Sequence, residues 1–231
     1  MKPRRKIIII AAAGIFVLLL AVGGGALWLI NNQNKQMSPL GNQEVIPGIY
    51  AVRNDIVNIY LIQSGDKYIA IDAGMNEAQT REGLDVLGIS SDDIIAVLLT
   101  HTHFDHIGAL SIFDNATVYA SPDAKPNMAD QTVSDGMVFT IGKEFQVIST
   151  PGHADDSVCY LYDGKYLFTG DNLSLKDNKV GLFNSLYNNS DERQKADIRK
   201  LAGLTGVEYV FTAHYGYTDK ADFRIILKGD L

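Results

Sequence analysis

The sequence is short of the residues that build several common kinds of site. Its 231 residues include a single cysteine, Cys159, so the chain has no internal disulfide and no cysteine-rich zinc framework. Basic residues are also scarce, with 20 lysines and arginines against 27 aspartates and glutamates. No basic stripe is available to neutralise a nucleic-acid backbone. We therefore expect a small-molecule substrate and no nucleic-acid partner.

The one long apolar run lies near the N-terminus. Residues 7–30 contain no charged side chain. As a helix they would rise about 36 Å, close to the hydrocarbon thickness of a bilayer. Residues 1–6 carry four basic side chains, so the positive-inside rule places this tail in the cytoplasm. The pattern predicts a single-pass signal-anchor in the lipid bilayer of the cell membrane and an extracytoplasmic domain. A cleaved signal peptide, which would leave a secreted protein, is the alternative.

The rest of the chain divides into a linker and one domain. Residues 31–43 are polar and lack periodicity, which predicts a flexible stalk. In residues 44–231, short β-branched and aromatic runs form two blocks, and each block is followed by a helix and then a strand. We expect one helix capped by Asn76 and a later one capped by Ser190. This order predicts an α/β sandwich built from two similar halves.

Three of the five histidines share one short motif. His101-Thr-His103-Phe-Asp105-His106 follows the apolar run 94–99, which has the composition of a strand buried on both faces. In an extended turn His101 and His103 point the same way and can share a metal, while Asp105 and His106 reach a neighbouring position. The alternative is a cluster of solvated histidines, from which a loop gains no stability. The motif therefore favours a metal site.

The other two histidines also follow predicted strands. His153 ends Thr-Pro-Gly-His, and His214 lies in Thr-Ala-His-Tyr-Gly, at strand ends where open α/β sheets place their sites. Because all five histidines follow predicted strands, metal ligation is favoured over a structural role for them. Asp171 and Asp72 follow strands as well, although a carboxylate after a strand is more often part of a capped turn.

The ordered motifs resemble those of the metallo-β-lactamase superfamily over residues 45 to about 218. The motifs are Asp72, His101-x-His103-x-Asp105-His106, His153, Asp171 and His214. The resemblance implies an αββα sandwich with the metal site at the edge between its halves. It places His101, His103 and His153 on one metal. It places Asp105, His106 and His214 on a second metal, with Asp171 between both. It also implies that Asp72 steadies the histidine loop without touching a metal.

The ligand set predicts the chemistry. Nitrogen and carboxylate ligands without sulfur suit two Zn²⁺ ions, and a water shared between them has a pKa of about 7, so that it attacks as a hydroxide. Asp105 is the predicted catalytic residue, because it can orient this hydroxide and take its proton. Asp171 and the Asp105–His106 pair resemble the glyoxalase II and lactonase branch. We therefore expect a membrane-anchored dinuclear zinc hydrolase of an ester, thioester or lactone.

Three alternatives stay open at this point. One is a mononuclear iron oxygenase of sulfur compounds that resembles persulfide dioxygenases, because two histidines and one carboxylate can hold iron. The second is a β-lactam hydrolase, and the third is a binding module without catalysis. No feature of the sequence indicates an oligomeric state.

Some chemically interesting residues are predicted to lie in the core. Cys159 alternates with a tyrosine in a predicted strand and is expected to be a small core side chain. Phe183, Tyr187, Tyr215 and Tyr217 lie near predicted strands or the last histidine, and we expect them to be core residues rather than site residues.

Overall fold

The computed structural model describes residues 36–224 of the chain. The predicted tail at 1–6 and the predicted signal-anchor at 7–30 lie outside the described residues. Within residues 36–224, no helix has both the length and the apolar character that a membrane crossing requires.

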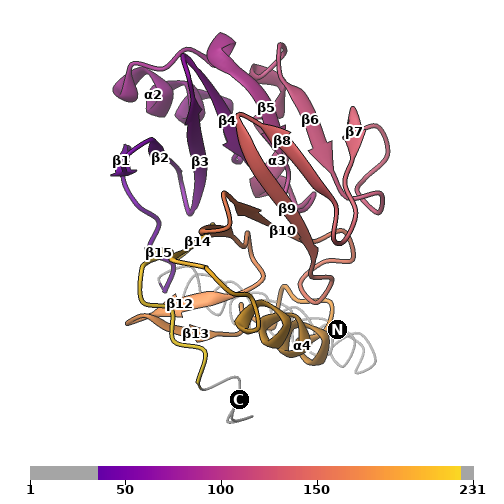
Figure 1. The fold of residues 1–231 in the computed structure, drawn as a ribbon. Coiled ribbons are helices and arrows are strands. Elements are labelled where there is room, and N and C mark those ends of the chain that lie inside the picture. The colour runs from indigo at the N-terminus through magenta and orange to yellow at the C-terminus, as the bar shows by residue number, and fades with distance from the viewer. Residues whose placement is uncertain (1–35, 225–231) are drawn as a thin grey trace, which may run out of the picture. The chain divides into compact units, whose positions relative to one another are not determined.

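Two large sheets make up the described part of the chain (Figure 1). The first sheet has the strand order β1 (Gln43–Ile46), β2 (Ile49–Asn54), β3 (Val57–Ser64), β4 (Lys67–Ile71), β5 (Ile94–Leu98), β6 (Thr117–Ala120) and β7 (Gln131–Thr132). The second has the order β15 (Gly216–Thr218), β14 (Tyr209–Thr212), β11 (Tyr166–Phe168), β10 (Val158–Tyr162), β9 (Lys143–Ser149) and β8 (Val138–Ile141). A separate hairpin joins β12 (Ser174–Lys176) to β13 (Lys179–Gly181).

Helices cover the outer faces of both sheets. They are α2 (Glu77–Leu87), α3 (Phe104–Ile107), α4 (Asp191–Ala202), and the 3₁₀ turns η1 (Ser91–Asp93) and η2 (Leu110–Ile112). Leu84 of α2 packs in one apolar cluster with side chains of the first sheet, and Ile198 of α4 packs in another with the second sheet. A third cluster, which includes Ile71 and Phe168, fills the space between the sheets. The αββα sandwich is confirmed.

Local sequence signals explain where the two long helices begin. The side chain of Asn76 accepts a hydrogen bond from the Gln79 N–H (3.1 Å) at the start of α2. Ser190 does the same for the Arg193 N–H (3.2 Å) at the start of α4, where two acidic residues occupy the first turn. These side chains satisfy N–H groups that a helix leaves unpaired, as expected from the sequence.

The domain starts earlier than residue 44. Ser38 donates its N–H to the His214 carbonyl (2.8 Å), and Leu40 donates its N–H to Asn58 Oδ1 (2.8 Å). Residues 38–43, which we predicted to be part of the stalk, are therefore bound to the domain. The compact unit begins at Ser38. Polar composition alone did not reveal these contacts, because their partners lie far along the chain.

Strand direction brings the predicted site residues to one edge. Strand β4 runs parallel to β5, and β11 runs parallel to β14. Asp72 and His101 follow the first two strands, and Asp171 and His214 follow the other two. Because parallel strands end at the same edge of a sheet, each sheet delivers its polar residues together.

Candidate metal centre

All seven side chains predicted as ligands lie together, in two groups. The first group is His101, His103 and His153, and the second is Asp105, His106, Asp171 and His214. In each group, one ligand atom from every residue lies within 4.8 Å of the others. The grouping agrees with the allocation that the resemblance implied.

In the first group, ring nitrogens point toward one another. His153 Nε2 lies 3.0 Å from His103 Nδ1, and the rings of His101 and His103 have centroids 4.5 Å apart. Two nitrogen lone pairs repel at this distance unless a proton or a cation lies near both. The arrangement suits a metal that takes three imidazole nitrogens.

In the second group, Asp171 lies between several histidines. Its Oδ1 is 3.2 Å from His214 Nε2, and its Oδ2 is 3.4 Å from His106 Nε2. The same Oδ2 is also 3.5 Å from His153 Nε2 and 3.9 Å from His101 Nε2, so it faces the first group as well. One carboxylate therefore presents oxygen atoms to both groups.

Four inner atoms of the site have no hydrogen-bond partner. His101 Nε2, His106 Nε2, His214 Nε2 and Asp171 Oδ1 are all buried without one. Carboxylate oxygens do lie 3.2–3.4 Å from two of these nitrogens, but not in hydrogen-bonding geometry. Unpaired buried polar atoms are costly, and four that face inward together fit metal cations.

The outer nitrogens of the second group are fixed by hydrogen bonds. His106 Nδ1 donates to Asp72 Oδ2 (2.8 Å), and His214 Nδ1 donates to the Ile56 carbonyl (2.7 Å). Each bond keeps a proton on Nδ1 and directs Nε2 into the site, where loss of the Nε2 proton frees a lone pair for a metal.

Asp72 also connects the two groups. It accepts hydrogen bonds from the Thr100 N–H (2.7 Å) and from Thr100 Oγ1 (2.8 Å), and Thr100 Oγ1 lies 3.2 Å from His101 Nδ1. Gly170 adopts a φ of +52°, and a Cβ there would collide with Thr100. Glycine therefore lets the strand end that carries Asp171 approach the histidine loop.

Charges across the site shift the pKa values of these groups in opposite directions. Burial, helped by the charge of His106, lowers the pKa of His101 well below its usual value. Burial alone would lower the pKa of His214, but the carboxylates of Asp171 and Asp105 raise it to about 9. The pKa of His106 is raised well above its usual value by the same kind of balance, with Asp171 and Asp72 outweighing burial. Two histidines thus hold positive charge where metal cations are expected to sit.

Sequence reasoning missed two residues that support the site, Asn188 in the loop 182–190 and Gln194 in α4. Asn188 Oδ1 accepts from His153 Nδ1 (3.0 Å), and Asn188 Nδ2 donates to Asp191 Oδ1 (2.8 Å) and Gln194 Oε1 (2.9 Å). Gln194 Nε2 also donates to the Asp171 carbonyl (3.3 Å). Asparagine and glutamine at these positions carry no motif, so no sequence signal identified them.

Replacing Asn188 with alanine is expected to weaken zinc binding at the first group about tenfold. This is the lower end of the range for residues that hydrogen-bond a metal-ligating histidine, because the group that orients His153 is a neutral amide. The measurement is zinc affinity by competition with a chelator. Asn189→Ala is the matched control, since Asn189 contacts His153 only through its backbone, with its N–H 2.8 Å from the His153 carbonyl. Equal affinities for the two variants would contradict this role.

The loop 182–190 carries two aromatic side chains, of which Phe183 is buried and Tyr187 is exposed. Phe183 is buried, as predicted, but its ring packs against His153 (5.0 Å between centroids) and His214 (5.4 Å), so it covers both groups. Tyr187 is 38% exposed, so the prediction that it belongs to the core is wrong.

Cys159 is buried, as predicted.

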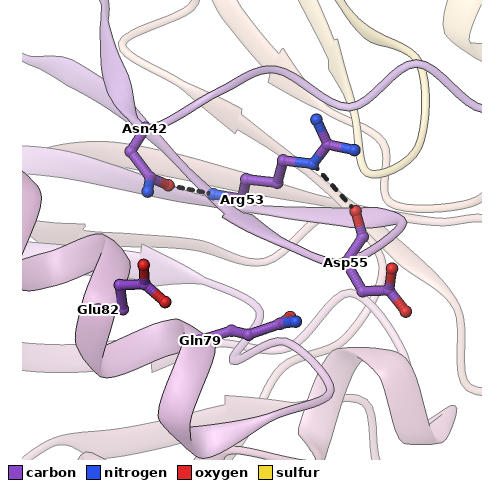
Figure 2. Close-up of a pocket in the computed structure, with 5 residues that line it drawn as sticks. All are labelled: Asn42, Arg53, Asp55, Gln79 and Glu82. Carbon is purple, nitrogen blue, oxygen red and sulfur yellow. Dashed lines mark hydrogen bonds between the residues drawn. The ribbon is translucent and has the colours of Figure 1, made fainter.

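A separate surface pocket of about 290 Å³ lies between β2 and α2 (Figure 2). Its lining residues are Asn42, Arg53, Asp55, Gln79 and Glu82. Arg53 donates its backbone N–H to Asn42 Oδ1 (2.7 Å) and its Nε–H to the Asp55 carbonyl (3.2 Å). None of these five residues belongs to the metal groups.

Comparison with known proteins shows which superfamily the chain resembles. The family model of the metallo-β-lactamase superfamily matches residues 52–122, which include Asp72 and the histidine motif. A probable metallo-hydrolase of Methanocaldococcus jannaschii is 34% identical over 139 residues, which cover 60% of this chain and 66% of that protein. The chain resembles the metallo-β-lactamase superfamily.

Further members of the superfamily extend the comparison. A hydroxyacylglutathione hydrolase of Francisella tularensis subsp. novicida is 34% identical over 142 residues, covering 58% of this chain and 55% of that enzyme. The crystal structure of a metallo-β-lactamase family protein from Thermus thermophilus has a TM-score of 0.62, with 23% identity and 77% of each chain covered, which supports the fold. The chain thus spans 66% or less of the length of these two curated relatives.

Proposed function

We propose that the chain is a metal-dependent hydrolase that uses two zinc ions to cleave an ester, thioester or lactone. The observation that carries this proposal is a pair of ligand groups that the Asp171 carboxylate faces together, with four buried ligand atoms that have no hydrogen bond. Three imidazoles in one group, and two imidazoles with two carboxylates in the other, are ligand sets that zinc prefers. The curated relatives named as hydrolases support the same class of reaction.

Zinc ions at such a site supply Lewis acidity and lower the pKa of a water held between them to about 7. The residues of the chain have three tasks around this chemistry. Asp105, Asp171 and the five histidines would hold the ions, and Phe183 excludes water from the side of His153 and His214. Asp105 also handles a proton.

Asp105 is suited to accept a proton from the attacking water at its Oδ2. This oxygen lies 3.3 Å from His214 Nε2, and its side chain is 24% exposed, whereas those of His106, Asp171 and His214 are at most 4% exposed. Burial raises the pKa of Asp105, but the nearby charges of His106 and His214 outweigh burial and lower it below its usual value. The side chain is therefore a carboxylate at neutral pH and can act as a base.

The relative named as a hydroxyacylglutathione hydrolase acts, by its name, on an acylated thiol. This supports a thioester among the three substrate classes. We further propose that the domain acts outside the cytoplasm, anchored by residues 7–30, because the uncharged run follows a basic tail. Digestion of intact cells with an external protease tests this proposal: loss of residues 44–231 supports it, and full protection contradicts it.

Metal content and activity of one sample of the full-length chain test the proposed function. We expect about two zinc ions per chain and hydrolysis of at least one ester, thioester or lactone in a panel, with no activity in a His101→Ala variant. About one iron per chain, with oxygen consumption on a persulfide, would replace the hydrolase by the oxygenase alternative. Hydrolysis of β-lactams alone would overturn the substrate class, and the absence of bound metal would favour a binding module.

Loading the metal-free protein with zinc at about pH 7.5 is expected to release about three protons per chain, one each from His106 and His214 and about one from the water held between the ions. The pKa values of both histidines are raised, to about 9 for His214, so both are protonated in the metal-free state, whereas zinc binds neutral imidazole. Zinc affinity therefore falls as the pH falls.

Calorimetry in buffers with different ionisation enthalpies counts these protons. A His214→Ala variant is expected to release about one proton fewer. An unchanged count in that variant would contradict the assignment of one proton to His214.

A further inference from the structure

Two strands on opposite sides of the sandwich contact the metal edge in the same way. Strand β3 belongs to the first sheet and β10 to the second. Each reaches across to the strand end of the other sheet that leads into a ligand histidine. The contacts of β10 are called the first clamp, and those of β3 the second clamp.

The first clamp joins β10 to the segment before His101. The Val158 N–H donates to the Thr100 carbonyl (2.8 Å), and the Tyr160 hydroxyl donates to the Leu99 carbonyl (2.9 Å). Two successive peptide groups ahead of His101 are thus fixed by alternate residues of one strand.

The second clamp joins β3 to the segment before His214. The Asn58 N–H donates to the Ala213 carbonyl (2.8 Å), and the Tyr60 hydroxyl donates to the Thr212 carbonyl (2.9 Å). The spacing matches that of the first clamp. In each clamp, a backbone N–H donates to the carbonyl one residue before the histidine. The tyrosine two residues further along the same strand donates to the carbonyl two residues before the histidine.

The pattern continues into the site itself. Two residues before Asn58, the Ile56 carbonyl accepts from His214 Nδ1 (2.7 Å). Two residues before Val158, Asp156 Oδ2 accepts from the Thr102 N–H (2.8 Å), and Thr102 lies between two ligands of the first group. Each clamp therefore ends on the ligand loop that it supports.

The tyrosines are suited to fix position rather than merely to fill volume. Tyr160 and Tyr60 are 0% and 3% exposed, in the apolar cluster between the sheets. Burial raises the pKa of both hydroxyls, so both stay protonated donors. A hydrogen bond in an apolar surrounding without water is stronger and more directional than one at the surface.

We propose that Tyr160 and Tyr60 are positioning residues, each for one metal group: Tyr160 sets the position of His101 in the first group, and Tyr60 sets that of His214 in the second. This inference rests on the proposed two-metal site. Neither tyrosine touches a ligand atom of the site, so each acts through the backbone ahead of a histidine. Because each clamp crosses between the sheets, metal binding at either group also depends on how the two sheets dock.

Tyrosine-to-phenylalanine variants of the full-length chain in detergent test the proposal, because phenylalanine keeps the ring and removes only the donor. Zinc is titrated into metal-free protein in competition with a chelator, and the imidazole ¹⁵N shifts of His101 and His214 report the two groups separately. Tyr160→Phe is expected to weaken the first group about tenfold and to leave the second within about twofold, and Tyr60→Phe is expected to do the reverse.

Tyr162→Phe is the matched control, since Tyr162 is also buried in β10 but lies further from the metal edge. It is expected to change neither affinity. If both clamp variants weaken both groups equally, or change neither, while the wild type binds two zinc ions, the clamp assignment is overturned and the proposed function stands. If the wild type binds no zinc, both are overturned.

A measurement on the wild type needs no substitution. Amide hydrogen exchange is followed as zinc is added to about one ion per chain. We expect the Val158 N–H to become protected as zinc fills the first group, and the Asn58 N–H to become protected as zinc fills the second group. Protection of both amides in step with a single group contradicts the assignment of one clamp to each group.

Discussion

Replacing Asp171 with asparagine is expected to lower zinc content from about two ions per chain to at most one, and to slow hydrolysis at least about a thousandfold. Asp171 Oδ1 faces His214 and Oδ2 faces His106, His101 and His153, so one carboxylate serves both groups. Asparagine has the same shape but offers one ligand oxygen and no charge. Its amide group would point N–H donors at one of the two sets of nitrogens.

The control for this variant is Asp93→Asn. Asp93 precedes β5 and pairs with Lys67 (2.6 Å), whereas the metal site follows the other end of that strand. It is expected to keep zinc content and activity, because a partly exposed ion pair contributes little. Elemental analysis and turnover on the same samples decide the matter. An Asp171→Asn protein that still binds two zinc ions would show that another group joins the metals.

Local patterns in the sequence predicted most of the secondary structure that positions the site. The apolar run 94–99 contains β5, and α2 and α4 begin after their predicted caps. The short strands β12 and β13, and the one-turn helix α3, were not predicted. Three or four residues carry too little periodicity to reveal an element, and α3 lies inside the histidine motif.

The chemistry of the site was more visible in the sequence than its support. Histidines and aspartates at strand ends indicated a common edge, and the structure brings all seven together. Asn188, Phe183 and the hydroxyl of Tyr60 were not identified, because each acts on a ligand far away in the sequence. From sequence alone, a tyrosine in a strand is predicted to be a core residue. Only the register between sheets shows that its hydroxyl reaches the carbonyl of Thr212.

The second large effect is expected from Asp72→Asn, with zinc affinity of the second group lowered about 10- to 100-fold. His106 Nδ1 donates to the Asp72 carboxylate, which fixes the ring and increases the electron density on Nε2. Asparagine has one acceptor oxygen for two donors, the His106 Nδ1–H and the Thr100 N–H, and its neutral oxygen makes the ring a weaker ligand. The first group is expected to change less, since Asp72 reaches His101 only through Thr100.

Asparagine is the informative replacement because the backbone at Asp72 has a φ of +63°. Aspartate and asparagine tolerate this left-handed conformation, whereas alanine adds strain of about 1 kcal/mol and leaves the buried Thr100 N–H without its partner. Asp72→Ala should therefore lower both zinc affinity and thermal stability, and Asp72→Asn should lower stability less, because it keeps one acceptor oxygen and adds no backbone strain.

Activity of Asp72→Asn measured against zinc concentration separates affinity from chemistry. If Asp72 only orients and strengthens His106, turnover returns toward the wild-type value at excess zinc, because the ligand set itself is intact. Turnover that stays low at saturating zinc would instead place the Asp72 charge in the chemical step. That outcome would move Asp72 from supporting the site to taking part in the reaction.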